Sequence, residues 1–567
     1  MSTEPTTSPK RPSSASAQSS SSRLRGDLIG GLVAAVVALP LALAFGVQSG
    51  LGAEAGLYGA IGAGIVAALF GGTPTQVTGP TGPMTVVSAT VVSLAIAEAG
   101  SVESALGIIL LTFAVGGVLQ IVFGVLGVAK YVRYFPYPVV SGFMSGVGLI
   151  IVVLQIWPFL GSDSPSSTLE VITRIGEPLS NIDPAAVGIG LFTVAAFYLL
   201  PKVTTIIPPA LGALLAGTIA AVVADLDVPV IGDIPQGLPT LQIGEMLTVD
   251  PSMWLLVVEY GLILAILGSI DSLLTSVIAD NITRTKHDSN RELIGQGLGN
   301  LAAALIGGLP GAGATKGTVV NIDAGGTTRL SGTFHGVLLL VMLLGAGSLV
   351  SVVPLAVLAG ILIPIGFAIV DTKGLKHLRD VPRADAIVLV TVLLITVFGD
   401  LIIAVGTGLV MACVLFMKKL ADLGEERAVL VPLSDDGTAL SDTALQTIGD
   451  HVHLKRVYGP LFFGVVARFR ELSEQLPEDA RVLIIDLTEV PSIDQSGLYA
   501  IEDVVLDLEQ SGVEVHLVGL GDQPLDMLKD TELVGALIAP DEVHPTLNDA
   551  VAAIGAATDT NEGALSS

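Results

Sequence analysis

Two short phrases rich in Gly, Thr and Pro carry residues that could bind a small ion. Residues 79–87 read GPTGPMTVV and residues 311–320 read GAGATKGTVV, and each phrase interrupts apolar sequence. Gly and Pro break helices, and a helix that begins inside a bilayer presents free N–H groups and the positive end of its dipole. Such an end suits an anion. The hydroxyls of Thr81, Thr85, Thr315 and Thr318 could cap these helix starts or reach the ligand.

Two charged residues belong to the same apolar sequence. Asp271 stands in the segment LGSIDSLLTSVIADN, with Thr275 one helical turn later on the same face. Carboxylate, hydroxyl and carbonyl oxygens together would suit a hard cation such as Na⁺. Asp271 could equally carry a proton or act as the counter-ion of Lys316. That lysine follows Thr315, where it would attract an anion or turn away from the site.

The elements that must position these residues are membrane-spanning helices. The chain of 567 residues is 51% hydrophobic and only 14% charged, against about 25% charged residues in soluble proteins. Apolar windows long enough to cross a bilayer recur from residue 28 to residue 418. We expect fourteen spans, in two groups of seven separated by the acidic segment 225–250: 28–47, 53–71, 80–98, 105–128, 136–159, 184–201 and 206–224, then 255–278, 293–309, 314–324, 332–350, 354–371, 384–398 and 400–417.

The loops predict the orientation. Lys and Arg gather in alternate short loops, and with fourteen crossings nearly all of them fall on one side, so both termini are expected in the cytoplasm. An odd number of spans in each half makes the second half inverted relative to the first. Helices broken by Gly and Pro at matching places of inverted repeats mark a transport site near the middle of the membrane. The alternative for the two phrases is a pair of packing glycines and a proline kink.

The two ends of the chain differ from this apolar region. Residues 1–23 are Ser-rich and are expected to form a disordered tail, with the membrane domain at 24–420. Strand and helix patterns alternate within 428–552, which predicts a small cytoplasmic α/β domain, followed by a flexible tail at 553–567. Residues 421–567 hold 28 acidic against 7 basic residues. This excess argues against nucleic-acid binding. The sequence shows no nucleophile–base pair, metal cluster or phosphate loop, so an enzyme is not expected.

Several segments resemble a known family. They include RGDLIGGLVAAVVALPLALAFGVQSG, GLYGAIGAGIVAALFGGTPTQ, PTGPMTVV, SGFMSGVGLIIVVLQ, IDSLLTSVIADNITRTKHDSNRELIGQGLGN and GAGATKGTVVNIDAGGTTRLSG. These segments resemble the SulP family, the solute carrier 26 anion transporters, and within it most the BicA-type bicarbonate carriers. The stretch LIIDLTEVPSIDQSGLYAI resembles the STAS domain. The resemblance covers about residues 24–420 and the C-terminal domain.

The resemblance implies an all-α membrane domain with a seven-plus-seven inverted repeat, a mobile core (spans 1–4 and 8–11), a gate (spans 5–7 and 12–14) and a homodimer. Carried over by position, Thr81, Ala314 and Thr315 would line the anion site, and Asp271, Thr275 and the backbone of Gly313 would hold Na⁺. In soluble STAS proteins the serine at the place of Ser496 is a phosphorylation site. The alternative is that Asp494 or Ser496 caps the following helix.

The chain departs from the BicA type at Lys316, where those carriers typically have an apolar residue and many other family members a basic one. A fixed ammonium could supply the charge that Na⁺ otherwise brings. We therefore expect a secondary active transporter in the plasma membrane, with bicarbonate as the first substrate, sulfate as the second, and Na⁺ as the co-ion. H⁺ coupling, anion exchange and a non-transporting sensor that signals through its STAS domain are the alternatives.

Overall fold

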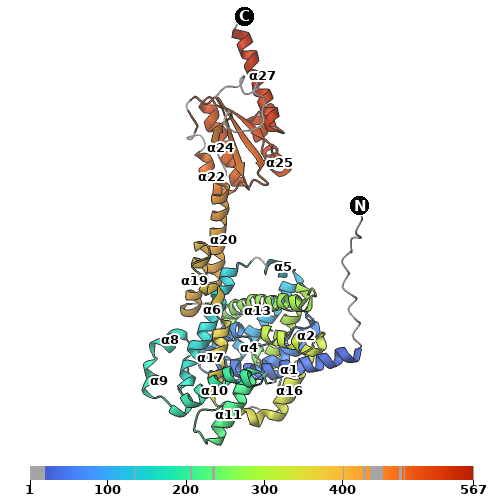
Figure 1. The fold of residues 1–567 in the computed structure, drawn as a ribbon, viewed down its shortest axis with the longest axis vertical. Coiled ribbons are helices and arrows are strands. Elements are labelled where there is room, and N and C mark those ends of the chain that lie inside the picture. Colours follow the sequence, from blue (N-terminus) through green and yellow to red (C-terminus); the bar gives the residue numbers. More distant parts are fainter. Residues whose placement is uncertain are drawn as a thin grey trace, which may run out of the picture. The chain divides into compact units, whose positions relative to one another are not determined.

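The computed structural model describes residues 20–132, 135–165, 167–204, 207–232, 237–399, 401–425, 430–433, 451–471, 476–477 and 479–565. The chain forms two compact units, Met1–Leu409 and Val410–Ser567. The first is almost entirely helical, and the second contains a five-stranded sheet (Figure 1).

Each of the fourteen predicted spans coincides with a helix of the structure. These are α1 (Ser20–Gln48), α2 (Ala53–Phe70), α3 (Gly82–Ala99), α4 (Val102–Val125), α6 (Tyr137–Leu154), α10 (Pro184–Val203), α11 (Pro209–Val223), α13 (Trp254–Thr283), α14 (Ser289–Leu305), α15 (Thr315–Asp323), α16 (Arg329–Val350), α17 (Leu355–Ile369), α19 (Arg383–Phe398) and α20 (Leu401–Glu425). Short helices in the connections are α5 (Ala129–Val132), α7 (Ile156–Phe159), α8 (Thr168–Thr173), α9 (Gly176–Ser180), α12 (Ile243–Leu247), η1 (Pro251–Met253) and α18 (Thr372–Lys376). Within the described residues, eight helices are long and apolar enough to cross a membrane.

The helices pack in two groups that match the predicted core and gate. In the first group, α14 packs against α2 and α4, and α1 packs against α16 and α15. In the second, α6 packs against α17 and α19, and α10 packs against α11 and α17. The same contacts recur when the two halves of the membrane domain are exchanged. Helix α4 of the first half contacts α13 and α14 of the second, and its counterpart α16 contacts α1 and α2 of the first. This is the packing expected of two repeats related by a pseudo-two-fold axis.

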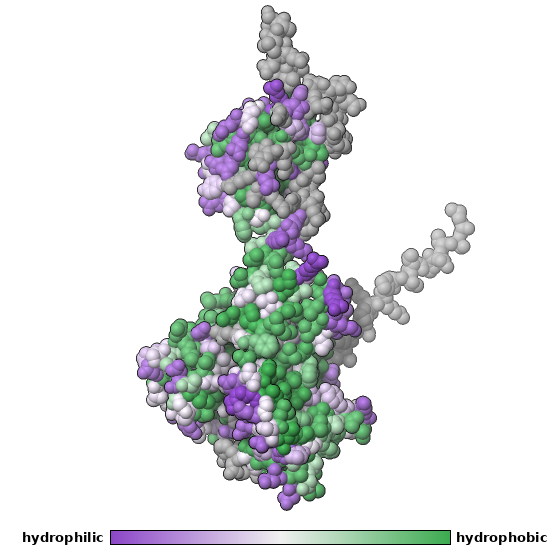
Figure 2. Space-filling model, turned by 90° about the vertical axis from the view of Figure 1, so that its left-hand side faces the viewer, coloured by the Kyte–Doolittle hydropathy of each residue, from purple (hydrophilic) through white to green (hydrophobic). Residues whose placement is uncertain are grey.

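The surface of the first unit carries many large apolar side chains. Val203, Val223 and Leu255 are 87%, 80% and 78% exposed. Figure 2 shows hydrophobic residues in green over a broad part of the visible face of this unit. Contiguous apolar surface of this extent is unusual for a soluble protein, and lipid is the environment that it suits.

The second unit is an α/β domain, as the sequence predicts. Its strands lie in the order β3 (Leu430–Pro432), β4 (Val452–Tyr458), β5 (Val482–Glu489), β6 (Glu514–Val518) and β7 (Val543–His544), parallel from β4 onward. The helices are α22 (Phe463–Arg470), α24 (Gln495–Gln510), α25 (Asp522–Asp530), α26 (Leu533–Ala536), η3 (Pro540–Glu542) and α27 (Leu547–Leu565). Apolar residues of α22 and α24 cover one face of the sheet, and those of α27 cover the other.

The predicted tails coincide in part with helices. The predicted disordered tail, residues 1–23, lies outside the described residues up to residue 19, and α1 begins at Ser20. The predicted flexible tail, residues 553–567, falls largely within α27, which ends at Leu565. An alanine-rich stretch such as AAIGAAT favours a helix because alanine loses no side-chain entropy on forming one.

Candidate functional site

The two Gly-rich phrases meet in the interior of the first unit. Residues Thr78–Gly79 form β1 and Ala312–Gly313 form β2, and these two strands pair antiparallel, with Thr78 opposite Gly313 and Gly79 opposite Ala312. Helix α3 begins at Gly82, three residues after β1, and α15 begins at Thr315, two residues after β2. The phrases therefore are two helix starts joined by one pair of short strands. Their first N–H groups have no partner within the helix.

Helix α13 passes beside this strand pair and holds it through two side chains, those of Ser272 and Thr275. The backbone N–H of Gly313 donates to Ser272 Oγ at 3.0 Å, and Thr275 Oγ1 donates to the Gly313 carbonyl at 2.8 Å. Thr275 Oγ1 lies 2.7 Å from Thr315 Oγ1. Because Thr275 donates its only hydroxyl proton to the Gly313 carbonyl, the hydroxyl of Thr315 must be the donor in its contact with Thr275.

Asp271 faces the other helix start. The hydroxyl of Thr81 donates to Asp271 Oδ2 at 2.9 Å, so the residue before α3 is tied to α13. Thr81 precedes α3 in an extended conformation, and its side chain makes no cap bond to the helix. Among the described residues, no basic side chain forms an ion pair with Asp271. The carboxylate is left with lone pairs that a cation could use.

Of the seven predicted ligand residues, five take part in the hydrogen bonds that tie α13 to the two helix starts: Thr81, Asp271, Thr275, Gly313 and Thr315. Ala314 donates its N–H to the carbonyl of Val77 at 2.8 Å, so its backbone donor serves the strand pair. The other two threonines of the Gly-rich phrases, Thr318 and Thr85, do not join these hydrogen bonds. Thr318 Oγ1 accepts from the N–H of Val77 at 3.0 Å, and Thr85 Oγ1 is buried without a partner among the described residues.

Lys316 and Asp271 line different cavities. Asp271 lines a cavity of about 240 Å³ with apolar residues of α6, α13 and α20, among them Phe143 and Leu409. Lys316 lines a different cavity, of about 50 Å³, with residues of α1, β1 and α16. The hypothesis that Asp271 is the counter-ion of Lys316 finds no ion pair in the described part of the chain.

A buried carboxylate that was not predicted from the sequence holds the loop before β1 in place. Glu292 of α14 is 1% exposed. Its two oxygens accept four hydrogen bonds of 2.8 Å, from the backbone N–H groups of Gly72 and Thr73 and from the side-chain amides of Gln76 and Gln296. Glu292 therefore holds the loop that leads into β1.

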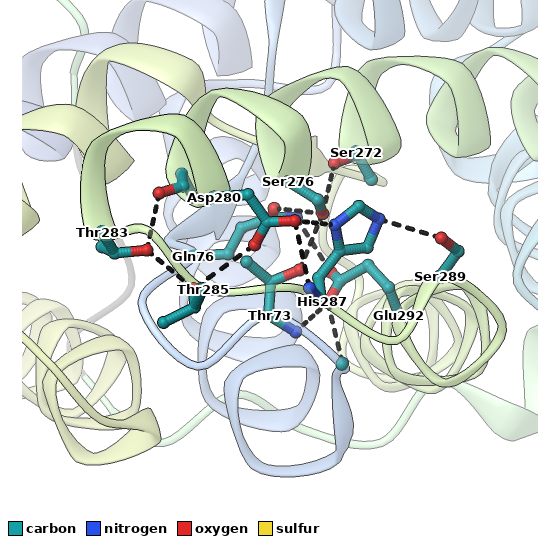
Figure 3. A network of polar contacts seen from close by, with 12 residues as sticks. Thr73, Gln76, Ser272, Ser276, Asp280, Thr283, Thr285, His287, Ser289 and Glu292 are labelled. Carbon is teal, nitrogen blue, oxygen red and sulfur yellow. Dashed lines mark hydrogen bonds and ion pairs between the residues drawn. The ribbon is translucent and has the colours of Figure 1, made fainter. Parts of the chain in front are cut away.

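The loop is tied to α13 as well (Figure 3). Ser276 Oγ donates to Gln76 Oε1 at 2.9 Å and lies 2.7 Å from Thr73 Oγ1. Gln296 Nε2 also reaches Thr78 Oγ1 of β1 at 2.7 Å. The signal in the sequence was a Glu and a Gln four residues apart, one helical turn, at the edge of the ninth predicted span.

A second group of residues in Figure 3, Asp280, His287 and Ser289, closes the turn between α13 and α14. Asp280 Oδ2 lies 2.7 Å from His287 Nδ1, and His287 Nε2 lies 2.9 Å from Ser289 Oγ. This contact joins the end of α13 to the start of α14, and so fixes the two helices that carry Asp271 and Glu292.

In the second unit, Ser496 is the second residue of α24. The cap of this helix is Asp494, whose side chain accepts the N–H of Gly497 at 2.8 Å. The predicted capping role thus belongs to Asp494. Ser496 is partly exposed, and its phosphorylation stays a prediction.

Comparison with known proteins gives two family matches. The model of the sulfate permease family matches residues 24–392, and the model of the STAS domain matches residues 444–550. A curated relative named bicarbonate transporter BicA, from Picosynechococcus sp., is 43% identical over 521 residues, which cover 90% of this chain and 91% of the relative.

Two solved structures are similar to the chain. The transmembrane domain of a cyanobacterial bicarbonate transporter BicA is 44% identical, with a TM-score of 0.62, over 69% of this chain and 97% of that one. The murine solute carrier 26 family member A9 anion transporter, in its inward-facing state, has a TM-score of 0.79 at 20% identity, over 94% of this chain and 91% of that one. At 20% identity, the similarity to the murine transporter shows a shared fold.

Proposed function

The chain belongs to the sulfate permease family of inorganic anion transporters, and we propose that it carries bicarbonate across the plasma membrane together with Na⁺. It is a multi-pass membrane transporter and not an enzyme. The proposal for bicarbonate is supported by the relative named for that substrate, which aligns over nearly the full length of both chains. The single structural observation behind it is the joining of two helix starts at the β1–β2 pair.

The anion would bind where the two helices begin. Helices α3 and α15 each direct unpaired N–H groups and a positive dipole end toward this place, except that Pro83 has no N–H to offer. The hydroxyls of Thr81 and Thr315 flank it. A planar monovalent oxyanion with three oxygens could accept from several of these donors at once.

The cation would bind on the α13 side. Asp271, Thr275 and the carbonyl of Gly313 offer the oxygen ligands that a hard cation prefers. A Na⁺ ion there would coordinate the Gly313 carbonyl and so replace the hydrogen bond that Thr275 donates to it. Cation and anion would then neutralise one another across Thr315, so each would raise the affinity for the other by the same factor.

Transport would proceed by alternating access. The core helices α1–α4 and α13–α16 would move against the gate helices, carrying both ions with them. The cavity in front of Asp271 is walled by α13 from the core and by α6 and α20 from the gate, which is where such a movement would open or close a path. In this arrangement the termini face the cytoplasm, the STAS unit lies there, and the transporter works as a homodimer.

Sulfate is the second candidate substrate, because the family is described by sulfate permeation and no pocket dimension here discriminates between the anions. H⁺ in place of Na⁺ is the second candidate for coupling, with Asp271 as the proton carrier. A sensor without transport is the distant alternative, and it predicts a phosphorylated Ser496 and no flux.

The test is uptake of labelled bicarbonate into proteoliposomes that contain the purified protein. We expect uptake that rises several-fold when an inward Na⁺ gradient is imposed. Uptake indifferent to Na⁺ would overturn the symport, and sulfate uptake in the absence of bicarbonate uptake would overturn the substrate. Empty liposomes give the background.

A further inference from the structure

A small cavity with mostly apolar walls lies beside the two helix starts, and Asp271 is not among the residues that line it. Its volume is about 50 Å³, and its walls include Leu41 of α1, Pro80, Ala314, Lys316 and His335 of α16. The only titratable side chains among its lining residues are Lys316 and His335. The cavity is large enough for a water molecule, whose share of liquid volume is roughly 30 Å³.

His335 needs a hydrogen-bond partner in this cavity. Its side chain is fully buried, at 0% exposure, and neither ring nitrogen has a partner among the described residues. A neutral imidazole carries one donor and one acceptor, and burying both unpaired is costly. A methyl group on Gly64 of α2 would come within 3.3 Å of His335 Nδ1, so α2 packs closely against the ring. The room for a partner lies on the side of the cavity.

Lys316 offers the complementary group. It is exposed at the second residue of α15, and within the described residues no acceptor is assigned to its three ammonium protons. A lysine without a partner in a membrane domain tends to extend toward water. An acceptor inside the cavity would oppose that and hold the ammonium near the start of α15.

We propose that a water molecule in this cavity bridges Lys316 and His335, and that His335 thereby positions the Lys316 ammonium beside the anion-binding helix starts. The water accepts one ammonium proton and donates one of its own to the unprotonated ring nitrogen. His335 itself does not touch the anion. The inference rests on the proposed function, because it assigns to this pair a share of the positive field that attracts the anion.

The test is the concentration dependence of bicarbonate uptake in proteoliposomes. We expect His335→Leu to raise KM about three- to tenfold, the range of a net hydrogen bond, with a smaller change in kcat. His335→Gln should recover most of the affinity, since an amide both donates and accepts. Thr333→Val is the matched control: Thr333 lies on the same helix, bonds the carbonyl of Arg329 and does not line the cavity, so its KM should stay unchanged.

A double variant separates positioning from bulk packing. If His335 acts through Lys316, then His335→Leu introduced into Lys316→Met should change KM by less than about twofold. Effects that multiply in the double variant would overturn the proposal, and so would a His335→Gln variant as weak as His335→Leu.

An experimental density map that resolves ordered water tests the bridge without any transport assay. We expect a water within hydrogen-bond distance of His335 and of Lys316 Nζ. A dry cavity, or a Lys316 side chain turned to the surface, would contradict it. A wild-type protein that takes up no bicarbonate would defeat the proposed function, and the map would still decide on the bridge.

Discussion

At the scale of single residues, the account depends most on Asp271. Its carboxylate lies at the start of α3, where it accepts a hydrogen bond from Thr81. Asp271→Asn removes the charge and keeps the shape. We expect bicarbonate uptake to fall by more than about tenfold, the effect of losing one charge-assisted contact to the cation, and the remainder to be independent of Na⁺.

The control for Asp271→Asn is Glu259→Gln, an exposed carboxylate on the same helix, which should leave uptake and its Na⁺ dependence unchanged. The measurement is initial uptake with and without a Na⁺ gradient. If Asp271→Asn instead retains exchange and loses only its pH dependence, Asp271 is a proton carrier, and the cation site is not there.

Which residues gather at the site was predictable in large part, because broken helices at matching places of two halves leave few other arrangements. Thr81, Asp271, Thr275, Gly313 and Thr315 do lie together. The direction of Lys316 was not predictable, since a helix start leaves a long side chain free to point to either side. Glu292 was missed because its role depends on a loop 220 residues earlier in the chain.

At the scale of elements, the loop before β1 depends on Glu292. Glu292→Gln would present an amide NH₂ to a site where every neighbour is a donor. Leaving such buried donors unsatisfied costs roughly 1–3 kcal/mol. We expect a lower midpoint of thermal unfolding in detergent and weaker Na⁺ stimulation of uptake. Glu98→Gln, at an exposed position near the end of α3, should change neither. An unchanged midpoint for Glu292→Gln would contradict the role of this network.

The strand pair itself can be tested at Gly311. Its N–H donates to Asn300 Oδ1 at 2.7 Å, and a methyl group there would overlap the backbone of Gly79 in the opposite strand. Gly311→Ala should therefore force β1 and β2 apart and abolish uptake. Gly345→Ala on α16, where a methyl group meets nothing within 4 Å, is the control and should transport normally. Normal uptake by Gly311→Ala would show that the strand pair is dispensable.

In the STAS unit, a histidine pair joins β6 and β7 beneath α27. His516 Nδ1 lies 3.0 Å from His544 Nε2, and both side chains are buried. Burial, with the neighbouring His516, lowers the pKa of His544, while Asp549 and Asp541 act in the opposite direction. The folded form thus binds a proton less readily than the unfolded one. The neutral His544 therefore contributes to the stability of the folded domain above the unfolded histidine pKa of about 6.5, and this contribution is lost as the pH falls below that value.

Hydrogen exchange of the full chain tests the histidine pair. After correction for intrinsic rates, peptides from the first turns of α27 should exchange faster at about pH 5.5 than at about pH 7.5, a range that spans the ordinary histidine pKa. His544→Gln should remove most of this difference. Equal protection at both pH values in the wild type would contradict the assignment.

At the scale of the whole molecule, the fold was predictable to the level of its helices. All fourteen apolar segments are helical, and the two packing groups match the expected core and gate. The alternating strand and helix patterns predicted within residues 428–552 correspond to the sheet β4–β7 and its helices, because alternation of apolar residues is a strong signal. The two-residue strands β1 and β2 could not be predicted, since their pairing joins parts of the chain more than 230 residues apart.

The central claim is that one movement of the core carries bicarbonate and Na⁺ together, so the coupling must be reciprocal. The most direct measurement is uptake of radioactive sodium into proteoliposomes driven only by an inward bicarbonate gradient, with the pH equal on both sides. The account predicts that the bicarbonate gradient accelerates sodium uptake in the wild type and fails to do so in Asp271→Asn. Sodium uptake that ignores the bicarbonate gradient in the wild type would contradict it.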